Sequence, residues 1–452
     1  MLVAVGLTTT DLKTLDHTEV VLTSSGALEV FQLPESRDLV TLLGVGTSDK
    51  PFEKIAAGQR FTVKGIKEAK TGSFVLEAFD GGKKLPRTNG CFLVRGSHSI
   101  NLLSIRRPGA SGTTGAKYNG SIAVFVRNGH VRVALILDLD KYLNGVLHSE
   151  IPASYHIEAV KAQAVAARTY GLNPRISHGK DGVNVCDSYL CCQYFGGLTT
   201  VSSPTHERAI HETLGEVLTY REKPILALFS SCAGGHTENY NNCFSDPATG
   251  QFPPPELPYL SGVPETKNKV DLKLFDDKNL RHFYNSAPYT VDAASNHFKW
   301  KVHLTADDLE SHMHATVQAM LKDERAPFVV APPSGKFGHI ESFRIPKRGV
   351  SGCAIEIEVK TSTGTWRVMK ELVIRDLFKT PGKKLARLKS ARIFLDQSHD
   401  KLGHLSALSI SGLGWGHGVG LQQTGAQGWA KEGSKYQTIL AHYFTGAKIE
   451  KV

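Results

Sequence analysis

The chain has 452 residues, of which 41% are hydrophobic and 21% charged, so it has the composition of an ordinary globular protein and room for two or three modules. Its net charge of +10 favours polyanionic partners, but the basic residues are scattered in pairs such as Arg106-Arg107, which argues against a nucleic-acid tail. The opening MLVAVGLTTTDLK has no basic region and only a short apolar run, which predicts a strand and excludes an intact signal peptide or a membrane span.

The first half of the chain predicts strands followed by a helical segment. Residues 1–115 contain short apolar runs separated by glycine turns, which predicts an N-terminal β-rich module. A hairpin around Asn128-Gly129 opens the middle segment, 116–265. A helix over 154–172 follows, with Ser154 as its N-cap, and then a cysteine-rich loop over 177–197 and a helix over 204–214.

The second half predicts a further lobe and a return to the middle segment. Residues 266–400 contain a strand and a helix over 297–322 and then an alternating meander, which predicts an α+β insertion or second lobe. Residues 401–452 form a glycine-rich loop that leads into a helix. The predicted fold class is therefore α+β, a strand-rich multi-module protein with a central alanine-rich helix.

The predicted helix over 154–172 carries small side chains on most of its circumference. Ala162, Ala164, Ala166 and Ala167 let other backbones approach closely, so we expect this helix to be central and buried. A buried Arg168 needs a carboxylate or carbonyl partner, which makes it either a structural anchor or a site residue.

Glu150 lies directly before Ile151-Pro152, at the end of an apolar segment. Desolvation there would raise the pKa of its carboxyl group and keep it protonated near neutral pH, as a general acid requires. The alternative is an exposed, inert glutamate. Roughly 21 Å of helix separates Ser154 from Arg168, so spacing alone does not place Arg168 beside Glu150.

Four of the seven cysteines lie in two close pairs. In the stretch HGKDGVNVCDSYLCCQYFGG, three interpretations stay open: a structural zinc site, a Cys186–Cys192 disulfide, and free thiols. The zinc ligands would be His178, Cys186, Cys191 and Cys192. The second pair, Cys232 and Cys243, predicts a disulfide across the turn AGGHTEN.

Five segments, in order, carry a resemblance to a known family: NGSIAVFVRNGHVRVAL, LDKYLNGVLHSEIPASYHIEAVKAQAVAARTYGL, GEVLTYREKPILALFSSCAGGHTEN, PYLSGVP and GWGHGVGLQQTGAQGWAKEGSKYQTILAHYFTGAKI. They resemble the stage II sporulation protein D family of peptidoglycan lytic transglycosylases, related to amidase-enhancer proteins. The resemblance runs from about residue 118 to 450 and is looser over 270–400.

The resemblance implies cleavage of the β-1,4 bond between N-acetylmuramic acid and N-acetylglucosamine, to a 1,6-anhydro product. It implies that Glu150 is the catalytic acid and that Arg168 takes part. One carboxylate suffices because the C6 hydroxyl of the muramyl residue attacks its own anomeric carbon, whereas ordinary glycosidases use two. Catalysis then requires no cofactor.

The glycine-rich run 414–428 is a candidate substrate-binding loop. Trp415 can stack on a sugar ring, while His417, Gln422 and Gln423 offer hydrogen bonds to hydroxyl or acetamido groups. The run lacks the Gly-Lys-Ser/Thr ending of a phosphate-binding loop, and a tight structural turn is the alternative. His236, in the AGGHTEN turn, is a further candidate, against the simpler interpretation of a polar loop.

The chain departs from the family pattern at two places. Leu421, Gln422 and Thr424 stand where the family usually has methionine, serine and tyrosine. Cys191 replaces the histidine of the pattern Cys-Asp-x-x-x-His-Cys-Gln, where some members carry zinc.

Three functions therefore compete. The first is a lytic transglycosylase that acts on peptidoglycan, on denuded strands in particular, in cell-wall remodelling. The second is a non-catalytic glycan-binding activator of a cell-wall amidase, and the third is a zinc hydrolase using the 178–192 cluster. The expected partners are peptidoglycan glycan strands and a cell-wall amidase, with no nucleic acid. The expected location is extracytoplasmic, with a signal or anchor absent from this chain.

Overall fold

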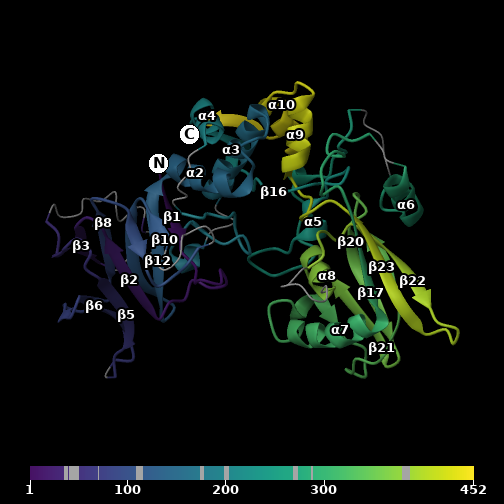
Figure 1. Cartoon of the computed structure of the whole chain (residues 1–452), viewed down its shortest axis with the longest axis horizontal. Helices are drawn as coiled ribbons and strands as arrows, with labels where there is room; N and C mark the ends of the chain where they lie inside the picture. Colours follow the sequence, from purple (N-terminus) through teal and green to yellow (C-terminus); the bar gives the residue numbers. More distant parts are fainter. Residues whose placement is uncertain are drawn as a thin grey trace. The chain divides into compact units, whose positions relative to one another are not determined.

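The computed structural model describes residues 1–34, 39, 50–69, 71–107, 116–173, 178–197, 203–267, 273–286, 289–378 and 387–452. The chain divides into two compact units: Met1–Val217 with Glu450–Val452, and Leu218–Ile449. Figure 1 shows the elements of each unit. Strands and helices occur in both, and the predicted α+β class is confirmed. Within the described ranges, no helix combines the length and apolar character needed to cross a bilayer.

Two mostly antiparallel sheets form the β-rich part of the first unit. Their strands are β1 (Leu2–Gly6), β2 (Glu19–Ser24), β3 (Leu28–Leu33), β4 (Glu53–Ile55), β5 (Phe61–Lys67), β6 (Phe74–Asp80), β7 (Lys83–Lys84), β8 (Cys91–Gly96), β9 (Ile100–Leu102), β10 (Ala116–Tyr118), β11 (Ser121–Arg127), β12 (His130–Asp138) and β13 (Val185–Cys186). Among the described residues, one sheet has the order β13-β1-β12-β11-β8-β3-β4 and the other β10-β9-β2-β5-β6-β7. Strands β5 and β6 contact β12 and β11, so the two sheets pack face to face.

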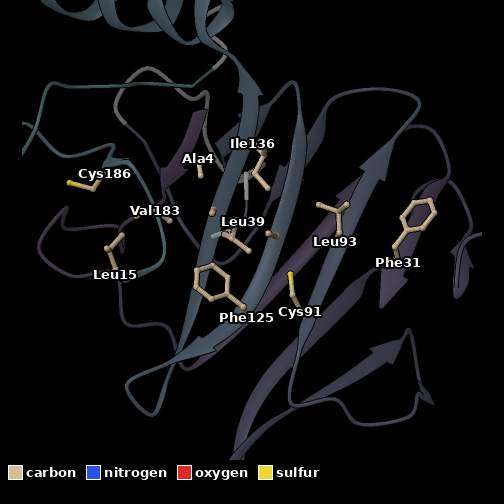
Figure 2. Close-up of a cluster of buried hydrophobic side chains, with 12 residues drawn as sticks. Ala4, Leu15, Phe31, Leu39, Cys91, Leu93, Phe125, Ile136, Val183 and Cys186 are labelled. Atoms are coloured by element: carbon tan, nitrogen blue, oxygen red, sulfur yellow. The ribbon is translucent and has the colours of Figure 1, made fainter. Parts of the chain in front are cut away.

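The seven-stranded sheet joins the N-terminal strands to the middle segment. Its strands β1, β3, β4 and β8 precede residue 115, whereas β11, β12 and β13 follow it, so the sheet crosses the predicted boundary at 115. The β11–β12 hairpin turns at Asn128 (φ 53°) and Gly129 (φ 75°), as predicted; both φ values are positive, as a type I′ turn requires. Figure 2 shows the core on one face of this sheet, where Cys186 and Val183 join Phe125.

Three mutually packed helices follow β12: α2 (Leu139–Glu150), α3 (Ile157–Leu172) and α4 (Pro204–Glu212). The central, buried helix that we predicted is α3, because Ala162, Ala164 and Ala166 have no exposed surface and let α2 and α4 approach. The prediction that Ser154 caps it is wrong. The cap is His156, whose Nδ1 accepts a hydrogen bond from the Glu158 amide at 3.3 Å.

The second unit contains two antiparallel sheets, a short parallel pair and six helices among its described residues. Its elements are β15 (Lys223–Pro224), β16 (Phe229–Ser230), α5 (Tyr240–Cys243), α6 (Asp277–Asn285), β17 (Lys299–Thr305), α7 (Ala306–Met320), β18 (Val329–Val330), β19 (Ile340–Arg348), β20 (Ala354–Thr361), β21 (Gly364–Met369), α8 (Glu371–Leu377), β22 (Ile393–His399), β23 (Leu405–Leu413), β24 (Leu421–Gln422), α9 (Gln423–Lys431) and α10 (Tyr436–Tyr443). The sheets have the orders β17-β23-β22 and β18-β21-β20-β19, and β16 pairs in parallel with β24. The units divide within β14 (Glu216–Tyr220) and β25 (Lys448–Lys451).

Candidate functional site

Glu150 is the last residue of α2 and is half-buried. Buried Leu143, Val146 and Leu147 fix the helix against the first unit, and extended backbone at Ile151 ends it. The Oε1 atom of Glu150 accepts a hydrogen bond of 2.7 Å from the backbone N–H of Tyr194. The carboxyl group that we predicted as a general acid is therefore held in place by a loop far along the sequence.

Each of the three residues of that loop, 193–195, contacts α2. The Gln193 amide donates to the Tyr142 hydroxyl at 2.8 Å and to the Ala167 carbonyl at 3.2 Å, which ties α2 and α3 together. The Phe195 ring lies so close to Gly145 that a β-carbon there would come within 2.4 Å of it. Sequence reasoning did not single out Gln193 or Phe195, although Gln193 belongs to the Cys-Gln pair of the family pattern.

Arg168 of α3 is 1% exposed and contacts both α2 and α4, the latter through the Ile210 carbonyl at 3.5 Å. Its Nη2 lies 3.2 Å from Asp140 Oδ1, and its Nη1 donates to the Glu216 carbonyl at 3.1 Å. Burial lowers the pKa of the guanidinium, and Asp140 opposes that effect. Asp140 precedes Glu150 by about 15 Å along α2, so the structure does not bring Arg168 and Glu150 together. A direct catalytic role for Arg168 stays a prediction, while its contacts are those of an anchor.

We expect Arg168→Lys to lower the free energy of unfolding of the first unit by about 2 kcal/mol, because lysine cannot span the Asp140 and Glu216 contacts at once. We also expect its rate on substrate to fall by less than about tenfold at temperatures where it is folded. Urea unfolding and product rates measure the two effects. A fully folded variant as inactive as a Glu150 variant would give Arg168 a direct part in the chemistry.

The cysteine-rich loop brings the four predicted metal ligands together. The donor atoms of His178, Cys186, Cys191 and Cys192 all lie within 4.8 Å of one another. Both Cys191 Sγ and Cys192 Sγ are 3.4 Å from His178 Nε2. Zinc bound at about 2.0 Å to nitrogen and 2.3 Å to sulfur would separate such atoms by about 3.5 Å in a tetrahedral site. These residues therefore fit zinc.

The surroundings of the cluster also suit a metal. Asp181 Oδ2 lies 2.9 Å from His178 Nδ1, the carboxylate–histidine pairing that orients a metal-bound imidazole. Hydrogen bonds from Cys186, then Cys192 and His178, lower the pKa of the Cys191 thiol, whereas hydrogen bonds with Cys191 and Cys192 raise the pKa of the Cys186 thiol. The buried Asp187 pairs with buried Arg107 and fixes the loop to the N-terminal strands.

The structure pairs none of the predicted disulfides, since all seven cysteines are free. The Cys232–Cys243 bond is contradicted because the two thiols face different partners. Cys232 Sγ lies 3.6 Å from Asp292 Oδ2, whereas Cys243 Sγ lies 3.5 Å from the His417 carbonyl oxygen. Cys186 and Cys192 are likewise unpaired, and both belong to the cluster around His178.

In the second unit, Trp415 is the candidate sugar-stacking residue and is 41% exposed. Its backbone exchanges two hydrogen bonds of 3.0 Å with Cys232, which fixes the start of the glycine-rich loop. The His297 ring packs edge-to-face against the indole at 4.4 Å, and the Lys389 ammonium lies 5.2 Å from the ring centre. Sequence reasoning missed both neighbours because they come from the loosely matching region.

The other candidates in the second unit are less accessible. Gln422 is fully buried, donating to the Gly420 carbonyl and accepting from Ser230, so it has no exposed atom for the predicted substrate contact. Gln423 is 8% exposed at the first turn of α9. His236 is half-buried, with Nδ1 2.6 Å from the Thr237 carbonyl oxygen. These contacts support the loops themselves.

His417 is held as a neutral imidazole. Its Nδ1 accepts a hydrogen bond of 3.0 Å from the Val419 amide. Burial, and then the nearby Arg375 guanidinium, lowers the pKa of His417 from 6.5 to about 4. Because the unfolded chain then takes up the proton first, the stability contributed by His417 is complete above about pH 6.5 and is lost as the pH falls toward 4.

We therefore expect the second unit to lose stability between pH 7 and 5, and His417→Gln to reduce that loss by about 1–2 kcal/mol. Urea unfolding at the two pH values measures it. His312→Gln, an exposed histidine on α7, is the matched control and should leave the pH dependence unchanged. An identical pH dependence in wild type and His417→Gln would contradict the prediction.

A buried carboxyl group, Glu265, supports the C-terminal motif, and sequence reasoning missed it. Glu265 accepts hydrogen bonds from the Tyr443 hydroxyl at 2.8 Å and the Trp429 indole at 3.2 Å. Burial, and then Asp292, raises the pKa of Glu265 well above its usual value. Glu265 follows directly on the quoted PYLSGVP segment, which was the available signal. It ties the preceding loop to α9 and α10.

Comparison with known proteins shows what the chain is similar to. A family model described as Stage II sporulation protein matches residues 127–220, and a domain of unknown function (DUF8618) matches residues 247–420. The chain is 28% identical over 324 residues to the amidase enhancer of Bacillus subtilis (strain 168), which covers 68% of this chain and 40% of that protein. It is 25% identical over 328 residues to stage II sporulation protein D of the same organism, covering 70% and 75%. An uncharacterised protein of Brachyspira hyodysenteriae is 26% identical over 336 residues, covering 74% and 73%.

The family match spans Glu150, Arg168 and the cysteine cluster. The predicted resemblance to the stage II sporulation protein D family and to amidase enhancers is confirmed, because the family model and two of these relatives carry those names. These similarities support a cell-wall-related role. The chain spans less than half the length of the amidase enhancer.

Proposed function

We propose that this chain is a peptidoglycan lytic transglycosylase in which Glu150 is the acid that cleaves the bond between N-acetylmuramic acid and N-acetylglucosamine. One observation carries the proposal. Glu150 lies half-buried at the end of α2, with Oε1 held at 2.7 Å by the Tyr194 amide, inside the segment that matches the family model.

The carboxyl group would act twice. In its neutral form it protonates the glycosidic oxygen as the bond to the muramyl anomeric carbon breaks. The resulting carboxylate then removes the proton of the muramyl C6 hydroxyl as that oxygen bonds to the anomeric carbon. The acid is thereby regenerated, and the product carries a 1,6-anhydro ring without consuming water.

The surroundings of Glu150 position its carboxyl group. The Tyr194 N–H donates to Oε1 and holds it at the end of α2. A carboxyl group held in one place can donate a proton and take one back at the same site.

A structural zinc is part of the proposal. His178, Cys186, Cys191 and Cys192 would hold it, and bound zinc would cross-link the loop and supply no step of the reaction. Cys191 and Cys192 come directly before Gln193 and Tyr194. Zinc bound to these cysteines would therefore also hold in place the Tyr194 N–H that donates to Glu150.

The similarity to these relatives also supports a proposal for substrate and partners. We propose denuded glycan strands as the substrate, with Trp415 of the second unit as a sugar contact and the net charge of +10 favouring acidic wall polymers. The similarity to an amidase enhancer supports a cell-wall amidase as a partner, and an extracytoplasmic location fits both.

Product analysis tests the function. Purified protein is incubated with denuded glycan strands, and the products are separated and weighed by mass spectrometry. Products ending in 1,6-anhydro-N-acetylmuramic acid are expected. Reducing muramyl ends would indicate a hydrolase, and intact glycan together with faster cleavage by an added amidase would indicate an activator.

A further inference from the structure

Tyr189 and Leu190 expose an apolar surface on the cysteine-rich loop. Tyr189 is 62% exposed and Leu190 is 44% exposed, although the residues just before them, Asp187 and Ser188, are buried. Adjacent aromatic and aliphatic side chains exposed on the loop that holds a candidate catalytic group are typical of a ligand-binding surface.

The Tyr189 ring is held in place. It packs edge-to-face against the Tyr194 ring, with centroids 5.9 Å apart and planes at 75°. The Ser188 hydroxyl donates to the Leu12 carbonyl at 2.7 Å and accepts from the Leu190 amide at 3.1 Å, which fixes the turn beneath the ring. A preorganised ring loses little conformational entropy when a ligand stacks on it.

Tyr194 connects this ring to Glu150. Its side chain contacts Tyr189, and its backbone N–H donates to Glu150 Oε1 at 2.7 Å. Tyr194 therefore contacts both the exposed Tyr189 ring and the candidate acid, and all of these contacts come from the loop that positions Glu150.

We propose that the Tyr189 ring is a stacking platform for an N-acetylated pyranose of the glycan strand, next to the bond that Glu150 cleaves. The inference rests on the proposed function of Glu150. A pyranose presents axial C–H groups on one face, which match the flat, neutral face of a tyrosine ring, while its hydroxyl and acetamido groups stay in water. A solvent-exposed ring suits this mode better than a closed pocket does.

Binding and turnover test the platform separately. In the Glu150→Gln background, which leaves the strand uncut, Tyr189→Ala should weaken binding of denuded glycan oligosaccharides by about five- to tenfold. Tyr189→Phe and Tyr189→Trp should bind like the parent, since the ring carries the contact. Tyr289→Ala, which removes a tyrosine 69% exposed in the second unit, is the matched control and should change nothing. Zinc content and thermal unfolding are measured on every variant.

With Glu150 intact, Tyr189→Ala should raise KM by a similar factor and leave kcat nearly unchanged. Unaltered glycan binding by Tyr189→Ala would overturn the platform even if anhydro products form. Weakened binding without any anhydro product from the wild type would support the platform and overturn the proposed function. If Tyr189→Ala alters zinc content, glycan binding is compared between Tyr189→Leu and Tyr189→Phe instead. Equal glycan binding by these two variants would contradict a need for the aromatic ring.

Discussion

Replacing Glu150 by glutamine is expected to lower the rate of anhydro-product formation by about 10³-fold. The amide cannot donate a proton to the glycosidic oxygen or remove one from the C6 hydroxyl. It can still accept the Tyr194 N–H, so the end of α2 and the loop at 193–195 should keep their positions. The loss should fall on kcat, with KM changed little, because glutamine matches glutamate in shape. Initial rates on denuded glycan, quantified by mass spectrometry, measure the effect.

Two further variants sharpen that result. Glu207→Gln changes an exposed glutamate in the first turn of α4 of the same unit and should retain the wild-type rate. Glu150→Asp withdraws the carboxyl group from the Tyr194 amide and should fall between wild type and Glu150→Gln. A Glu150→Gln protein that keeps more than about a tenth of the wild-type rate would remove Glu150 from the chemistry.

The parts of this fold that sequence predicts are those fixed by local chemistry. The turn at Asn128-Gly129 follows from the positive φ values those residues tolerate, and burial of α3 follows from its alanines. The start of α3 was misplaced because a histidine ring, not the more usual serine, accepts the capping hydrogen bond.

The candidate site depends on contacts that spacing does not encode. Glu150 and Tyr194 are 44 residues apart, and the contacts of Gln193 and Phe195 with α2 bring them together. Arg168 illustrates the opposite case. The length of the helix predicted that Arg168 lies away from Glu150. The carboxylate that pairs with Arg168 is Asp140, at the opposite end of α2 from Glu150. The predicted Cys232–Cys243 disulfide is wrong because the two cysteines are close in sequence but their thiols face different partners in the fold.

Removing the metal should disable the same carboxyl group indirectly. We expect the purified protein to hold about one zinc ion per chain, and chelation or Cys191→Ala to release it. Without a cross-link at His178 and Cys192, the loop should loosen, and Tyr194 should no longer fix Glu150. The rate should then fall by about 10–100-fold, with lower thermal stability of the first unit. Metal analysis, thermal unfolding and product rates measure the three effects.

The pattern of rescue separates a structural metal from its alternatives. Added zinc should restore the chelated wild type but not Cys191→Ala, and Cys353→Ala, a buried cysteine of the second unit, should keep both metal and rate. Because Glu150 alone handles the proton, partly active metal-free protein should show the same pH dependence of kcat as the zinc form. A changed profile would place the metal in the reaction. A metal-free protein of full stability and rate, with Cys186 and Cys192 joined in its peptide map, would replace zinc by the disulfide that the sequence also allows.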